Sequence, residues 1–154
     1  MKNLLLALSF LTLVPMAHAQ ESWTQSSFKD DKGKNFQLYT LLSDNKDNNG
    51  QQLALLIVST KENSVSKLGF AFTEGSISCN NYCQYYIKFD DTASKYTFSI
   101  ENTAIKLQND QKEDFLINLK KSKELTLVLD KQRFYFTVSP LNFKYVNDLQ
   151  KNKD

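Results

Sequence analysis

Short segments in which apolar and polar residues alternate recur along most of this 154-residue chain. The clearest is 85–89, because Tyr85, Ile87 and Phe89 fall on the same face of an extended strand and are aromatic or β-branched. Groups of Asp, Asn, Gly and Lys separate such segments and are typical of turns. The nine segments with this pattern are 23–28, 36–42, 53–59, 68–72, 85–89, 96–100, 104–107, 124–129 and 133–138.

One further segment, 110–121, has the spacing of a helix. Phe115, Leu116 and Leu119 fall on one side of such a helix. Acidic residues lie in its first turn and lysines in its last, which suits the helix dipole, and we expect Asp110 to cap its start. Nine short strands with one internal helix predict a mainly β fold. We expect an antiparallel β-sandwich or flattened barrel with the helix on an edge or at one end.

The first 19 residues have the pattern of a secretory signal peptide. Lys2 precedes an apolar run at 4–14, and Ala17 and Ala19 place small residues before an expected cleavage point at Gln20. A membrane anchor is the alternative, but this run is too short, because a spanning helix needs about 20 apolar residues. The sequence therefore predicts a cleaved leader and a periplasmic or secreted protein.

The remainder reads as one β-rich domain, 20–150, followed by a polar tail, 151–154. Residues 141–150 have roughly helical spacing and predict a closing helical turn. No segment after the leader is apolar enough to span a membrane. Loss of Lys2 with the leader leaves 18 Lys and Arg residues (19 less one) against 17 Asp and Glu. Such a balanced charge argues against a nucleic-acid partner, which requires a clustered basic surface.

Cys79 and Cys83 are the two cysteines of the chain. In an exported protein such a pair predicts a disulfide, here closing a turn. A redox pair would have the closer Cys-x-x-Cys spacing, and zinc would need four ligands. Residues 45–50 resemble half of a calcium loop, but Leu56 stands where the bidentate Glu belongs. We therefore expect no metal and no cofactor.

Catalytic groups are scarce in the expected mature chain. The only histidine, His18, lies in the leader, so no Ser-His or Cys-His pair can form. Asp90 and Asp91 are the obvious carboxylate pair, but adjacent residues at a strand end are explained better by turn chemistry. An enzyme would need carboxylates brought together by the fold, and the sequence favours a non-enzyme.

Tyrosines gather on and beside the cysteine turn. Three loops are candidates for binding a partner: 43–51, 79–83 and 90–94. Only the second combines a covalent constraint with an aromatic residue. We predict a protein-binding site made of Tyr82, Asn80, Asn81 and Tyr86, since tyrosine is favoured at interfaces. The alternative is that Tyr85 packs inward and Tyr82 only covers the hairpin.

The order of elements also carries a resemblance. Trp23, an early strand ladder, the pair Cys79 and Cys83, one late helix and the aromatic strand 133–138 follow one another. This order resembles invasion-associated locus B type proteins, which are small exported β-rich bacterial proteins. It is also similar to periplasmic inhibitors and immunity proteins that neutralise cell-wall-degrading toxins. The resemblance implies a non-catalytic module that binds a toxin or envelope protein as an inhibitor or immunity protein. The alternative it implies is an invasion-associated or structural host-interaction factor.

Overall fold

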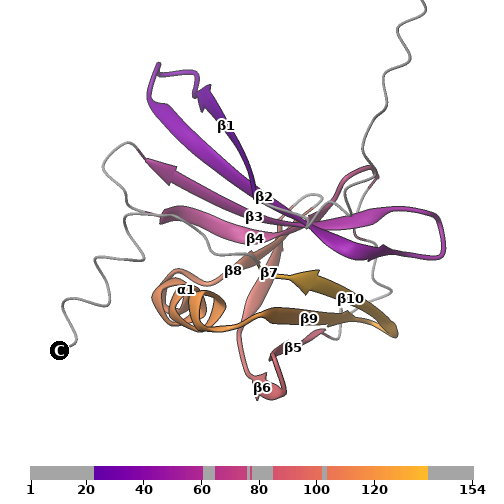
Figure 1. Ribbon diagram of the computed structural model, residues 1–154. Helices are drawn as coiled ribbons and strands as arrows, with labels where there is room; N and C mark the ends of the chain where they lie inside the picture. The colour runs from indigo at the N-terminus through magenta and orange to yellow at the C-terminus, as the bar shows by residue number, and fades with distance from the viewer. Residues whose placement is uncertain (1–22, 61–64, 76, 78–84, 102–103, 139–154) are drawn as a thin grey trace, which may run out of the picture.

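The computed structural model describes residues 23–60, 65–75, 77, 85–101 and 104–138. Within them, ten strands form two antiparallel sheets, and one α-helix follows a short 3-10 turn (Figure 1). The six-stranded sheet has the order β1-β2-β3-β4-β8-β7, with bounds Thr24–Lys29, Asn35–Lys46, Gln52–Thr60, Val65–Phe72, Ala104–Leu107 and Phe98–Glu101. The four-stranded sheet has the order β10-β9-β5-β6, with bounds Gln132–Thr137, Glu124–Leu129, Tyr85–Phe89 and Thr92–Ser94. The predicted mainly β, sandwich-like fold is therefore confirmed.

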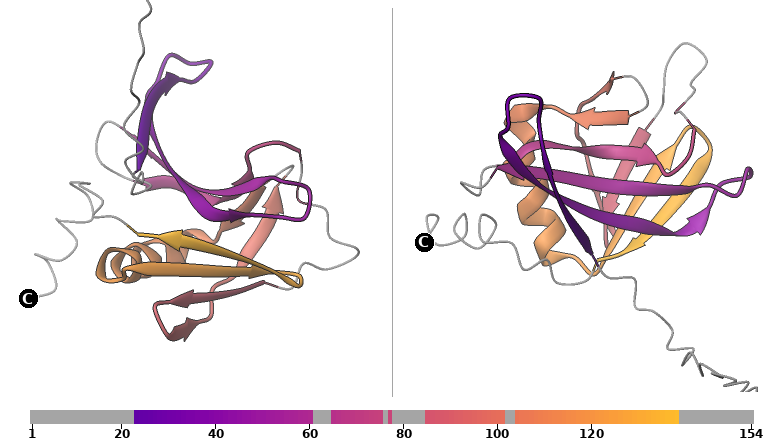
Figure 2. Two further views of the ribbon diagram at one scale, coloured as in Figure 1. Left: turned by 45° about the vertical axis from the view of Figure 1, so that its right-hand side comes forward. Right: turned by 90° about the horizontal axis from the view of Figure 1, so that it is seen from above.

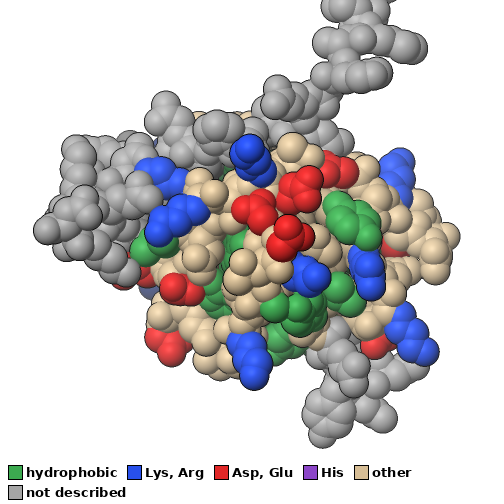
Figure 3. Space-filling view, turned by 60° about the horizontal axis from the view of Figure 1, so that its bottom comes forward, with side chains coloured by type: hydrophobic (Ala, Val, Ile, Leu, Met, Phe, Trp, Pro, Cys, Tyr) green, Lys and Arg blue, Asp and Glu red, His purple; other side chains and the backbone are tan. Residues whose placement is uncertain are grey.

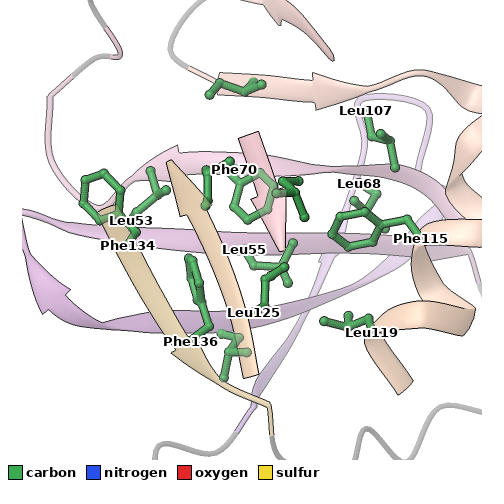
Figure 4. Close-up of a cluster of buried hydrophobic side chains, with 14 of the residues drawn as sticks. Leu53, Leu55, Leu68, Phe70, Leu107, Phe115, Leu119, Leu125, Phe134 and Phe136 are labelled. Atoms are coloured by element: carbon green, nitrogen blue, oxygen red, sulfur yellow. The ribbon is translucent and has the colours of Figure 1, made fainter. Parts of the chain in front are cut away.

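The two sheets enclose one hydrophobic core, and the helix closes one end of it (Figures 1 and 2). The largest fully buried side chains are phenylalanines from both sheets and the helix: Phe70, Phe115, Phe134 and Phe136. Phe70 lies between them, with ring centroids 6.3 Å from Phe115 and 5.9 Å from Phe136 (Figure 4). Such aromatic contacts add to the free energy gained by burying apolar area. The inward faces that alternation predicted are therefore the faces that meet.

The helix α1 runs from Lys112 to Lys121 and buries Phe115, Leu116 and Leu119 as predicted. The capping role predicted for Asp110 is wrong, because this residue lies inside the preceding 3-10 turn η1 (Asn109–Gln111) and no side chain caps the helix. Tyr96 ties the helix to the segment before β7. Its hydroxyl donates to Asp114 Oδ2 and accepts from Asn118 Nδ2, each at 2.8 Å. Burial raises the pKa of Tyr96 above its usual value.

The predicted loop 43–51 is wrong at its start, because β2 continues to Lys46 and the turn begins at Asp47. Ser43 is fully buried. Its hydroxyl donates to the Asn45 carbonyl at 2.6 Å and accepts from the Leu53 N–H at 3.0 Å. These bonds give partners to backbone groups at a bulge in the β2–β3 ladder. A polar segment whose sequence suggests an exposed loop is therefore held in a strand.

The predicted loop 90–94 is also shorter than expected. Phe89 pairs with Thr92, so Asp90 and Asp91 form a two-residue turn and Thr92–Ser94 becomes β6. Asp90 has a φ of 50°, and its Oδ1 accepts the N–H groups of Lys123 and Glu124 at 2.9 and 3.0 Å. A tight turn places the next three residues beside β5 whatever their hydrophobicity.

Several predicted features lie outside the described residues. They are the leader 1–19, Asn80, Asn81, Tyr82, the pairing of Cys79 with Cys83, the helical turn 141–150 and the tail 151–154. In the part of the chain that is described, no helix has the length and hydrophobicity needed to cross a membrane.

Candidate functional site on the four-stranded sheet

The outer side of the four-stranded sheet carries a two-row grid of side chains from β5, β9 and β10. Register places Tyr86, Val128 and Arg133 in one row. Lys88, Thr126 and Tyr135 form the next row. Directly opposite residues in antiparallel strands project from the same face. We call these six residues the tyrosine face.

The two tyrosines are half exposed on a rigid support. Tyr86 is 42% and Tyr135 46% exposed, whereas their strand neighbours Ile87, Phe134 and Phe136 are at most 2% exposed. Burial of alternate residues fixes the backbones of β5 and β10, so the tyrosines project from strands that cannot shift without disturbing the core. Large aromatic groups on a fixed scaffold lose little conformational entropy when they bind a partner.

A depression of about 580 Å³ covers the tyrosine face and continues to Asp90, Asp91 and Glu124 at one end. Lys88 and Arg133 supply positive charge in the grid itself, and the three carboxylates lie beyond it. Figure 3 views this side of the molecule, where hydrophobic side chains gather beside basic ones and a group of acidic side chains lies next to them. The tyrosine face therefore mixes aromatic and positively charged side chains, and carboxylates gather at one end of the depression.

The polar ends of these side chains are available to a partner. Among the described residues, no hydrogen bond or ion pair engages the hydroxyls of Tyr86 and Tyr135 or the charged groups of Lys88 and Arg133. The carboxylate of Asp90, in contrast, is occupied by backbone N–H groups. The tyrosine face thus offers hydrogen-bond donors and cations, and Asp90 serves the turn.

Asn45 holds the edge of this sheet in place. Its Nδ2 donates to the Arg133 carbonyl at 2.7 Å, and its Oδ1 accepts the Tyr135 N–H at 2.9 Å. The side chain therefore pairs with β10 as a neighbouring strand would. This contact joins the end of β2 to β10 and fixes the strand that presents Tyr135.

Of the four residues predicted to bind a protein, Tyr86 is the one that the structure describes, and it lies on the tyrosine face. Tyr85 packs inward, where its hydroxyl accepts the Phe98 N–H at 3.1 Å, as the alternative reading expected. Sequence reasoning missed Tyr135. Alternation could have found it, because Phe134 and Phe136 point inward and the residue between them must point outward.

Among the described residues, no group of three His, Cys, Asp or Glu side chains lies close enough together to hold a metal ion. Comparisons of this chain with protein-family models, curated protein sequences and solved structures found no match.

Proposed function

We propose that this chain is an exported, non-catalytic module that binds another protein through the tyrosine face. One observation carries the proposal: Tyr86 and Tyr135 project, half exposed, from adjacent rows of a rigid sheet. Interface energy is concentrated in a few aromatic and Arg anchors, and Arg133 lies in the same grid. A binding anchor requires such residues to be free of intramolecular partners, and these are free of them in the described part of the chain.

The shape of the surface favours a macromolecule. The residues that line the depression come from the outward positions of three strands and from the turn after β5, so it is part of the sheet surface. A broad surface of mixed polarity suits the core and rim of a protein interface better than a small ligand, which needs an enclosed pocket. The carboxylates at one end, beside the cations of the grid, would orient a partner of complementary charge.

An inhibitor or immunity protein is the form of this proposal that we prefer. The predicted leader directs the chain to the compartment in which cell-wall-degrading toxins act. Inhibition requires only a preformed surface that covers a partner, and the tyrosine face is preformed because its strands are fixed by the core. Asp90, whose carboxylate bonds the backbone of β9, supports the reading of the carboxylate pair as a turn and not as catalytic machinery.

Capture from envelope extract tests the binding proposal. Immobilised exported chain should retain a protein, and Tyr86→Ala and Tyr135→Ala should each weaken its binding by about 1–3 kcal/mol. Ile100→Ala is the control, because Ile100 is 49% exposed on the six-stranded sheet. Retention of the same protein by all three variants would refute the role of the tyrosine face. Capture that survives digestion of the extract with protease would point to a polysaccharide and overturn the protein partner.

The identity of the captured protein and the mass of the chain test the remaining parts. A lytic toxin or enzyme supports the inhibitor proposal, whereas a structural envelope or host protein supports the invasion-associated alternative. Export predicts an intact mass without residues 1–19. Full-length chain in the membrane fraction would contradict the predicted leader cleavage.

A further inference from the structure

The open edges of the two sheets differ in how they are protected from pairing with another strand. β6 has three residues and β7 has four, and short edge strands are poor templates. The edge of β10 is occupied by the Asn45 side chain. β1 has none of these features in the described part of the chain. It has six residues, all exposed, without proline, and its register with β2 is regular throughout.

The strand β1 therefore presents unused backbone groups. Alternate residues of a strand point their N–H and C=O groups to opposite sides, so half of the six residues direct theirs away from β2. No described strand lies on that side. Figures 1 and 2 show the β1–β2 hairpin standing away from the four-stranded sheet.

We propose that β1 pairs with β1 of a second copy of this chain, antiparallel about a twofold axis that passes between the Ser27 residues of the two copies. The Asp30 N–H donates to the Lys34 carbonyl in the hairpin, so the even-numbered residues of β1 direct their backbone groups to β2, and Ser27 directs its own outward. This inference does not rest on the proposed function, because the tyrosine face lies on the other sheet. The pairing would join the two six-stranded sheets edge to edge.

The side chains of β1 suit self-pairing. In this register Lys29, the one charged residue of β1, lies opposite Gln25 of the other copy. The two Lys29 residues are then about 14 Å apart, at 3.4 Å per residue, which exceeds the Debye length in physiological salt. The overall formal charge of +2 adds little repulsion between copies.

The same register covers the exposed aromatic of the strand. Phe28 is 43% exposed and stacks on Phe36 of β2 with ring centroids 5.3 Å apart. Ser26 of the second copy lies opposite Phe28, and the Phe28 rings of the two copies become diagonal neighbours on one face, within reach of each other. A contact limited to six residues a side is small, below about 1,200 Å², so we expect a weak dimer.

Analytical ultracentrifugation of the purified exported chain from about 10 μM to about 1 mM tests the pairing over the range of weak affinities. The average mass should rise toward that of a dimer. Ser26→Lys with Ser27→Lys should lower the association constant at least tenfold, because four added charges face one another across the axis. Thr92→Lys with Gln108→Lys adds the same charge at exposed positions elsewhere and should leave association unchanged.

A charge-reversal mixture guards against a folding defect. Ser26→Glu with Ser27→Glu should also be monomeric alone, and an equimolar mixture with the lysine variant should form a heterodimer. A wild-type chain that stays monomeric at the highest concentration overturns the proposal. A dimer that both charged variants retain, or a mixture that does not associate, overturns it as well.

Discussion

Gly69 lies in the middle of β4, between β3 and β8, where it is buried and pairs with Leu56 and Lys106. Glycine inside a strand normally lowers stability by about 0.5–1 kcal/mol relative to alanine. By that rule Gly69→Ala should stabilise the protein. The structure gives the opposite sign, because a Cβ at this position would overlap the carbonyl oxygen of Ile105. It would also lie 3.1 Å from the Ile105 carbonyl carbon and the Lys106 Cα.

The obstructing atoms decide the magnitude of the effect. All three belong to the backbone of β8 and cannot rotate away, so β4 and β8 must separate. That contact, through three residue pairs, is the one by which β8 and β7 join the six-stranded sheet. Overpacking lowers the free energy of unfolding by about 1–3 kcal/mol. Because no flexible side chain can move aside here, we expect a loss of about 3 kcal/mol. The loss is a large part of a typical stability of about 5–15 kcal/mol.

Urea unfolding followed by circular dichroism measures this loss. Gly69→Ala should lower the midpoint, and the m-value should fall too if β7 and β8 detach in the native state. Gly33→Ala is the control, since Gly33 has a φ of +76° and no atom within 4 Å of the added Cβ. It should lose about 1 kcal/mol from backbone conformation alone. A Gly69→Ala protein as stable as the wild type, or less affected than Gly33→Ala, would refute the close approach of β4 and β8.

Three further predictions concern polar groups and the cysteines. Asn45→Ala should lower the free energy of unfolding by about 1–3 kcal/mol, because it leaves the β10 edge unpaired. Aggregation through that edge should increase light scattering. An unchanged unfolding free energy and unchanged scattering would contradict the bridging role of Asn45. Burial, followed by the charge of Lys106, lowers the pKa of Lys112 from 10.5. Between that lowered pKa and 10.5 the unfolded chain binds a proton that the folded chain does not, so stability should rise with pH, and the rise should vanish in Lys112→Met. The pH dependence of urea midpoints measures this, and a parallel dependence in both proteins would contradict it. Cys79 and Cys83 should resist alkylation until they are reduced. Replacing both with Ser should lower the free energy of unfolding by only about 2 kcal/mol. Unfolding of that variant at room temperature would show that the disulfide contributes more stability than this.

The local periodicity of the sequence predicted much of the fold. Each of the nine predicted strands overlaps a strand of the structure, and 110–121 contains the helix. The inward positions Ile87 and Phe89 were predictable because successive side chains of a strand point to opposite faces. The same rule would have placed Tyr135 on the outside. These features depend on a residue and its near neighbours, which is why a single sequence carries them.

Only the tertiary structure shows which strands pair with one another. Alternation shows that Tyr86 and Tyr135 point outward, but only the order β10-β9-β5 brings them onto one face. Asn45 bonds a strand 88 residues away, and Ser43 is buried by a bulge that no local pattern marks. Gly69 shows why: its neighbour is the backbone of β8, whose position depends on the packing of both sheets. Pairing between distant segments depends on the free energy of the whole core, and so no short stretch of sequence decides it.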